Sequence, residues 1–126
     1  MIPDIEGMES MARAALRSIP EELRRHVSDV VIRIAEFPDD DLINDMGLAS
    51  PYDLLGLYQG VSLDRKSVSD PFPDVDMIFL YRKPILAYAQ QTGEKLTQVI
   101  RHVLIHEIGH HFGFSDDDMS RIEQRG

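Results

Sequence analysis

The stretch that decides the fold of this chain is Arg101–Asp116, with the sequence RHVLIHEIGHHFGFSD. It contains His106, Glu107 and, three residues after that glutamate, His110. Residues four apart on a helix lie one turn above each other, so the imidazoles of His106 and His110 share one face. Two imidazoles on one helical face, with a glutamate between them, form the pattern through which a helix binds a zinc ion.

The sequence beyond this pair supplies a third ligand. A catalytic zinc ion usually has three protein ligands and one open position. Gly113 can adopt the left-handed conformation that ends a helix, and Asp116 could then turn its carboxylate back toward the metal. The sequence therefore predicts a Zn²⁺ site formed by His106, His110 and Asp116, with Glu107 as general base. The alternatives for the third ligand are Asp117, Asp118 and Glu123.

Two further histidines flank the pair. His111 adjoins His110 and points about 100° away around the helix. It cannot bind the same ion, and a polar contact is the expected role. His102 lies one turn before His106 and could extend the metal-binding face, which is the less favoured interpretation.

The pattern His-Glu-x-x-His-x-x-Gly-x-x-Asp resembles that of the zincin metallopeptidases, especially the branch with a glycine turn after the second histidine. Most members of that branch have a third histidine where this chain has Asp116, and a minority have aspartate. The segments His106–Met119 and Leu55–Gly60 resemble a family of small bacterial single-domain proteins, the minimal zincin metallopeptidases. The resemblance implies a peptidase in which Glu107 takes a proton from the attacking water and passes it to the leaving amine.

The composition indicates one globular domain over residues 1–126. Hydrophobic residues make up 43% and charged residues 28% of the chain, as in ordinary soluble proteins. The absence of cysteine excludes disulfides, a thiol nucleophile and a thiolate zinc site. The N-terminal sequence lacks the features of a signal peptide, and no apolar run approaches the length of a membrane span. We therefore expect a cytoplasmic protein without a membrane partner.

The charge of the chain restricts its partners. A net charge of −9 argues against nucleic acid, because phosphate binding needs a basic surface. The acidic cluster Asp39–Asp41 is expected to be a solvated loop, and Asp117 and Asp118 are expected to lie at the N-terminus of the last helix. The expected partner is a peptide or protein substrate, and the oligomeric state stays open.

The hydrophobic pattern predicts an α+β domain with a small mixed β-sheet packed on a buried metal-binding helix. Helices are expected over 5–18, 21–26, 41–48, 84–91, 94–112 and 116–124. Strands are expected over 27–37, 54–63 and 76–81, with a mobile loop over 64–74. Gly56 and Gly60 suggest a bulge or a close approach by another backbone. The apolar metal-binding helix should be buried, with His106 and His110 on its buried stripe.

Several points stay open from sequence. In zincins an extended peptide pairs with a strand above the active helix, and the resemblance leaves 54–63 and 76–81 as candidates. The candidates for stabilising the oxyanion are Tyr52, Tyr58, Tyr81 and Arg82. Met119 lies too close to Asp116 to form the methionine turn of the glycine-turn zincins. A C-terminal subdomain that usually completes the cleft is expected to be missing, so the alternative function is a zinc-binding interaction module with little or no peptidase activity. A metal-free structural domain is a third hypothesis.

Overall fold

The computed structural model of the protein describes residues 2–60 and 75–125. The fold is α+β, as predicted, with six α-helices and one three-stranded sheet in these ranges. In chain order the elements are α1 (Ile5–Ser18), α2 (Glu21–Arg24), the 3-10 turn η1 (Arg25–Val27), β1 (Val31–Ala35), α3 (Asp40–Met46), the 3-10 turn η2 (Pro51–Asp53), β2 (Gly56–Gln59), β3 (Met77–Tyr81), α4 (Arg82–Thr92), α5 (Leu96–His111) and α6 (Asp116–Arg125). The loop predicted over 64–74, and the end of the strand predicted over 54–63, lie outside the described residues.

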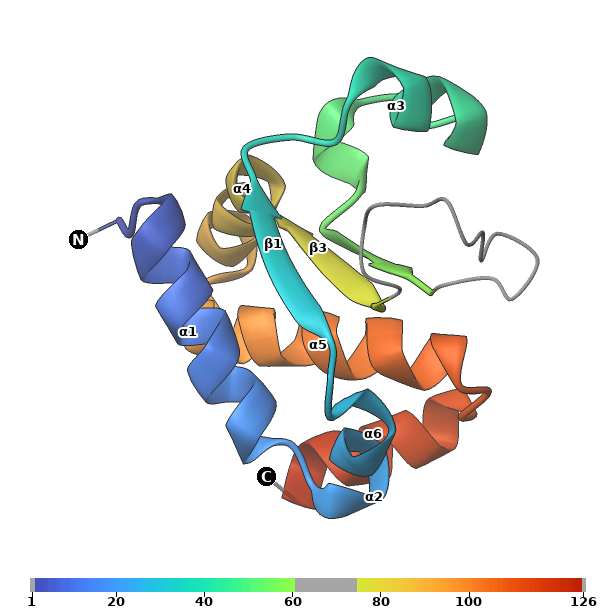
Figure 1. The fold of residues 1–126 in the computed structure, drawn as a ribbon. Helices are drawn as coiled ribbons and strands as arrows, with labels where there is room; N and C mark the ends of the chain where they lie inside the picture. Colours follow the sequence, from blue (N-terminus) through green and yellow to red (C-terminus); the bar gives the residue numbers. More distant parts are fainter. Residues whose placement is uncertain (1, 61–74, 126) are drawn as a thin grey trace.

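The sheet is mixed, with β3 in its centre. Its strand order is β1-β3-β2, and β3 pairs parallel to β1 and antiparallel to β2. Helices α1 and α5 contact each other, and each also contacts the sheet, α1 through β1 and α5 through β2. Figure 1 shows α5 crossing beside the sheet, and α6 running back along α5. The strand β2 is therefore an edge strand that lies next to the predicted metal-binding helix.

One predicted strand begins later than expected, and one predicted helix begins earlier. The strand predicted from Val27 begins only at Val31, because Val27 is the buried end of η1 and its carbonyl accepts the N–H of Val30. The helix predicted from Pro84 begins at Arg82, directly after β3. Proline fits this position because the first turn of a helix has no use for its missing N–H.

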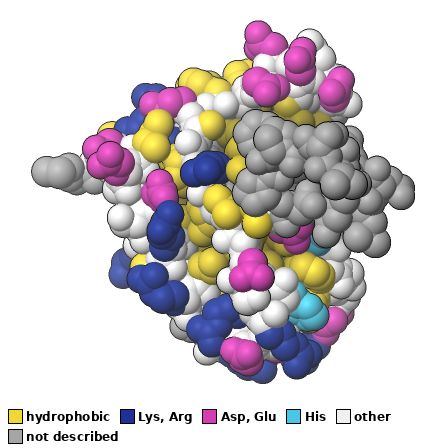
Figure 2. Space-filling model, viewed as in Figure 1, with side chains coloured by type: hydrophobic (Ala, Val, Ile, Leu, Met, Phe, Trp, Pro, Cys, Tyr) yellow, Lys and Arg dark blue, Asp and Glu magenta, His cyan; other side chains and the backbone are white. Residues whose placement is uncertain are grey.

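The acidic cluster at residues 39–41 is exposed, as predicted, but it is not a loop. Asp39 is the N-cap of α3, and its carboxylate accepts the N–H of Leu42 at 2.8 Å. Asp40 and Asp41 occupy the first turn, where a negative charge is favourable. Acidic side chains gather over α3 in Figure 2. Across the described ranges, no helix combines the length and the apolar character that crossing a membrane requires.

Helix α5 is the centre of the core, but its histidines do not lie on the buried stripe. Its buried residues are Val99, Ile100, Val103, Leu104, Ile105, Ile108 and Gly109. The side chains of His106 and His110 remain 27% and 59% exposed. The prediction that these histidines are buried was therefore wrong for His110 and only partly right for His106. They lie about 100° around the helix from Ile105 and Gly109, which places them at the border of the apolar face.

Candidate metal centre

A tight turn at Gly113 joins α5 to α6. Gly113 has a φ of 82°, the left-handed conformation that the sequence predicted for it. The N–H of Phe114 returns to the carbonyl of Gly109 at 2.8 Å, and Ser115 caps α6 by accepting the N–H of Asp118 at 3.1 Å. Because of this turn, α6 runs antiparallel along α5 (Figure 1).

Close packing near the Gly113 turn sets the distance between the two helices. Met119 of α6 is fully buried and lies against Gly109 of α5. A Cβ atom at Gly109 would lie 2.3 Å from the Met119 sulfur, so glycine is needed at this contact. Met119 is thus a core residue inside α6, as the sequence indicated, and its contact fixes how the two helices face each other.

Two of the three predicted ligands, His110 and Asp116, meet at the C-terminal end of α5, whereas the Nε2 atom of His106 faces Glu123. The Nε2 atom of His110 lies 3.5 Å from Oδ1 of Asp116, whose side chain is 89% exposed. The rings of His106 and His110 are 5.9 Å apart and nearly perpendicular. Asp118, an alternative ligand, instead pairs with Arg121. The structure therefore brings Asp116 to His110, with His106 one turn away.

A second group of potential ligands lies one turn earlier on α5. In residues 2–60 and 75–125, His102, His106 and Glu123 are the group whose ligand atoms all lie within 4.8 Å of one another. From the sequence, Glu123 is only an alternative third ligand, and metal binding by His102 is the less favoured interpretation. Two spacings in the sequence could have indicated this group. The histidines of α5 recur every four residues, and the acidic residues Asp116 and Glu123 of α6 are seven residues apart.

Glu123 is held in place by three residues of α5. Both of its carboxylate oxygens lie 2.9 Å from Nδ1 of His102, and Oε1 lies 3.5 Å from Nε2 of His106. The guanidinium of Arg101 donates to the Glu123 carbonyl at 2.8 Å. Burial lowers the pKa of His106, and the neighbouring His102 lowers it further, so the neutral form that can bind a metal is favoured.

Glu107 faces the sheet. Its carboxylate is partly buried and accepts the backbone N–H of Tyr58 at 3.2 Å. Burial raises the pKa of Glu107, and the Tyr58 hydrogen bond offsets part of this effect. A carboxylate with a raised pKa is a stronger base than an ordinary one, which suits a residue that takes up a proton.

Strand β2 lies directly against α5 because its first residue, Gly56, and the residue after its end, Gly60, have no side chains. A Cβ atom at Gly56 would lie 2.7 Å from Val103, and one at Gly60 would lie 2.6 Å from the His111 ring. The sequence suggested a bulge or a close approach by another backbone, but the atoms that approach these glycines most closely belong to side chains of α5. His111 stacks on Tyr58 with ring centroids 4.0 Å apart, so it contacts the edge strand as a ring rather than through a polar group.

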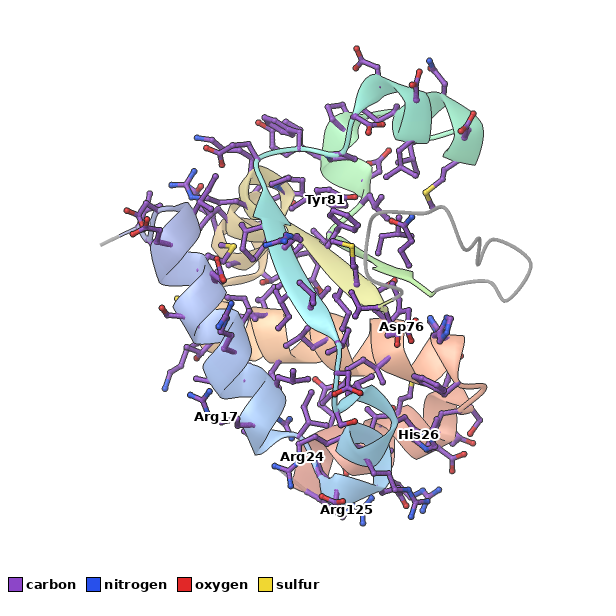
Figure 3. The ribbon with its side chains drawn as sticks, in the orientation of Figure 1. Arg17, Arg24, His26, Asp76, Tyr81 and Arg125 are labelled. Carbon is purple, nitrogen blue, oxygen red and sulfur yellow. The ribbon has the colours of Figure 1, made fainter. Side chains whose placement is uncertain are left out.

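Of the four oxyanion candidates, Tyr58 is hydrogen-bonded to Glu107, through its backbone N–H rather than its hydroxyl. Its hydroxyl donates to Asp76, the residue before β3 labelled in Figure 3, at 2.5 Å. Burial and the Asp76 carboxylate raise the pKa of Tyr58 above its usual range, so the hydroxyl stays protonated. Arg82 is engaged with Glu36 at 2.9 Å. The other two candidates are Tyr52, which is half exposed, and Tyr81, which is buried.

The donors fit a zinc ion. Imidazole nitrogens and carboxylate oxygens are the ligands that catalytic zinc sites use, and one position must stay open to water. His110 and Asp116 lie at the exposed end of the helix pair, so an ion held there can be reached from solvent. The site can therefore combine two imidazoles, a carboxylate and a nearby base.

Comparison with known proteins agrees with this geometry. The family model of the zincin-like metallopeptidases matches residues 27–125, from η1 through α6. No curated protein matches the chain. The matched range contains the whole sheet, α5 with Glu107, and α6 with both carboxylates. The chain belongs to the zincin-like metallopeptidase family.

Proposed function

We propose that the protein is a zinc-dependent peptidase whose metal ligands are His106, His110 and Asp116. The family, the imidazole and carboxylate donors, and the contact between His110 and Asp116 support this ligand set. A bound zinc ion would polarise the scissile carbonyl and lower the pKa of the attacking water. In this proposal Glu107 accepts the proton of that water and donates it to the leaving amine.

The edge strand β2 is the proposed docking site for an extended peptide. Among the described residues, β3 pairs on both sides, whereas β2 pairs with β3 alone and has its other edge unpaired. The N–H of Tyr58 points from that edge to Glu107, while the carbonyl of Leu55 accepts the N–H of Tyr81 on the β3 side. A peptide that adds to this edge by main-chain hydrogen bonds would run past Glu107. This arrangement favours the strand at 54–63 over the strand at 76–81.

The observation that carries the proposal is the position of Glu107, between the two histidines in sequence and against the edge of β2 that faces away from β3. The test compares cleavage of a peptide library by the wild type and by Glu107→Gln. We expect cleavage to fall by about a thousandfold or more, because general base catalysis and water positioning are both lost. Zinc content should stay near that of the wild type. A matched control is Glu94→Gln, in the turn before α5, which should cleave normally; retained cleavage in Glu107→Gln would refute the role of that residue.

The ligand set has its own test. Elemental analysis of His102→Ala, which lacks one member of the second group of potential ligands, should find about one zinc ion per chain, and much less once Asp116→Ala is added. Zinc that survives this substitution in full would move the third ligand to Asp117, Asp118 or Glu123. A wild type that binds zinc but cleaves no peptide in the library would favour the alternative function, a zinc-binding interaction module.

A further inference from the structure

The row of histidines on α5 is longer than one zinc site needs. His102, His106 and His110 recur every four residues, so their side chains follow one face over two turns. Helix α6 lies beside this row and places Asp116 at one end and Glu123 at the other. The proposed peptidase site uses only part of this set. His102 and Glu123 are two further residues of the types that bind zinc, and the proposed peptidase site does not use them.

These two residues converge with His106. The ring centroids of His102 and His106 lie 4.0 Å apart, and the nitrogen-to-oxygen distances to Glu123 are 2.9 and 3.5 Å. Two ligands of a tetrahedral zinc ion with bonds of about 2.0–2.1 Å are separated by about 3.3 Å. The measured separations lie on both sides of this value. All three ligand atoms also lie within 4.8 Å of one another, so small shifts bring them to the spacing that an ion of this size requires.

Hydrogen bonds within the protein hold this arrangement. The hydrogen bond of His102 to Glu123 and the hydrogen bond of Arg101 to the Glu123 carbonyl fix the carboxylate against α5. The side chains of His102, His106 and Glu123 are 43%, 27% and 31% exposed, so they are partly ordered yet open to an ion from solvent. Preordered ligands lose less conformational freedom on binding, which favours affinity.

We propose that His102, His106 and Glu123 form a second metal site that binds a divalent transition-metal ion such as Zn²⁺. This site includes His106, which is also a ligand of the proposed peptidase site. The Nε2 atom of His106 faces Glu123, and one nitrogen coordinates one ion at a time. The two sites therefore compete for His106, and metal in the second site withdraws this ligand from the first. The inhibition that follows from this competition rests on the proposed function, whereas the binding does not.

The experiment separates the two sites by removing the donors that each has alone. The full chain is stripped of metal, and Co²⁺ is added while its visible absorption and the heat of binding are recorded. The double variant His110→Ala/Asp116→Ala keeps only the second site, and we expect it still to bind one Co²⁺ ion. Adding Glu123→Gln should weaken binding by more than the roughly 10- to 100-fold that loss of a hydrogen bond to a ligand costs. Adding His102→Ala should have the same effect.

A control separates loss of a ligand from movement of α6. Glu22 pairs with Arg125 of α6 at 2.5 Å, so Glu22→Gln removes a carboxylate that contacts α6 without removing a donor of either site. It should leave Co²⁺ binding by the double variant unchanged. Circular dichroism verifies that each variant is folded.

Each outcome decides the proposal. A folded double variant that binds no Co²⁺ overturns the second site and leaves His102 and Glu123 as hydrogen-bonding partners of His106. Binding that survives both Glu123→Gln and His102→Ala overturns this ligand set. None of these measurements uses peptide cleavage, so failure of the peptidase proposal would not affect them. Competition has a separate readout: excess Zn²⁺ should inhibit the wild type several-fold more than His102→Ala, and equal inhibition overturns the competition alone.

Discussion

The two ends of the contact between α5 and α6 use the same pair of groups, an imidazole and a carboxylate, in different surroundings. At the Gly113 end, His110 and Asp116 are 59% and 89% exposed and lie 3.5 Å apart. At the other end, His102 and Glu123 are 43% and 31% exposed and lie 2.9 Å apart. The exposed pair has freedom to rearrange around an ion and a water. The half-buried pair is held by hydrogen bonds within the protein. The Gly113 end is therefore the open end of the contact, and the end at His102 and Glu123 is the preformed end.

The contact between Gly109 and Met119 lies between these ends and couples them. Gly109→Ala places a methyl group 2.3 Å from the Met119 sulfur, and Met119 is fully buried, so its side chain must shift within the core. Overpacking of this kind costs about 1–3 kcal/mol, and alanine returns up to about 1 kcal/mol through its helix propensity. We expect a net loss of about 2 kcal/mol in the free energy of unfolding, measured by urea denaturation.

A double variant tests whether the loss comes from this contact. In the background Met119→Ala, which is itself destabilised by its cavity, Gly109→Ala should cost nothing further because the clash is gone. If Gly109→Ala costs the same in both backgrounds, the Gly109–Met119 contact does not set the distance between the helices. The two ends would then be independent.

The same contact explains which parts of the site could be predicted from sequence. The zinc motif and the Gly113 turn are local, so helical spacing and one glycine were enough to place His110 near Asp116. The group at Glu123 depends on the antiparallel return of α6 and on its register along α5, which Met119 sets across a distance in sequence. No local rule gives that register. Sequence reasoning therefore kept Glu123 only as an alternative.

The fold divides in the same way. The α+β class, and each helix and strand, could be predicted from local patterns: helical spacing of apolar residues, runs of β-branched residues, and the prolines and glycines that bound the elements. The parallel pairing of β1 with β3 joins segments more than forty residues apart, at Val31 and Met77, and no pattern in either strand encodes it. That pairing makes β3 central and leaves β2 at the edge beside Glu107. The choice between the two candidate strands therefore needed the structure.

Arg101 belongs to the preformed end only, and its removal should weaken that end alone. Arg101→Met keeps much of the aliphatic side chain but removes the charged donor that binds the Glu123 carbonyl at 2.8 Å. A hydrogen bond from a charged group contributes about 1.5 kcal/mol or more, so we expect a loss of about that size in the free energy of unfolding. In the double variant His110→Ala/Asp116→Ala, Arg101→Met should also weaken Co²⁺ binding. Unchanged binding would show that Glu123 needs no support from Arg101.

Gly113 belongs to the open end only. Gly113→Ala forces an alanine to a φ of 82°, which costs roughly 1 kcal/mol or slightly more. Gly93 provides a matched control, because it ends α4 at a φ of 75° and a Cβ atom at either glycine has no heavy atom within 4 Å. Both substitutions should lower the free energy of unfolding about equally, yet only Gly113→Ala should weaken zinc binding through Asp116. Equal zinc affinities in the two variants would indicate that the turn does not position the ligand.

The smallest effect is expected at the pair Glu22–Arg125, which ties the last turn of α6 to α2 at 2.5 Å. Both side chains are about half exposed, so water and salt screen the pair, and such contacts contribute about 0.2–1 kcal/mol. Glu22→Gln should therefore lower the free energy of unfolding by at most about 0.5 kcal/mol at low salt, and by less in 1 M NaCl. A loss as large as that of Arg101→Met would mean that this surface pair, rather than the buried hydrogen bond, holds Glu123 against the histidines. The preformed end would then owe its geometry to α2, and its metal affinity should fall with rising salt.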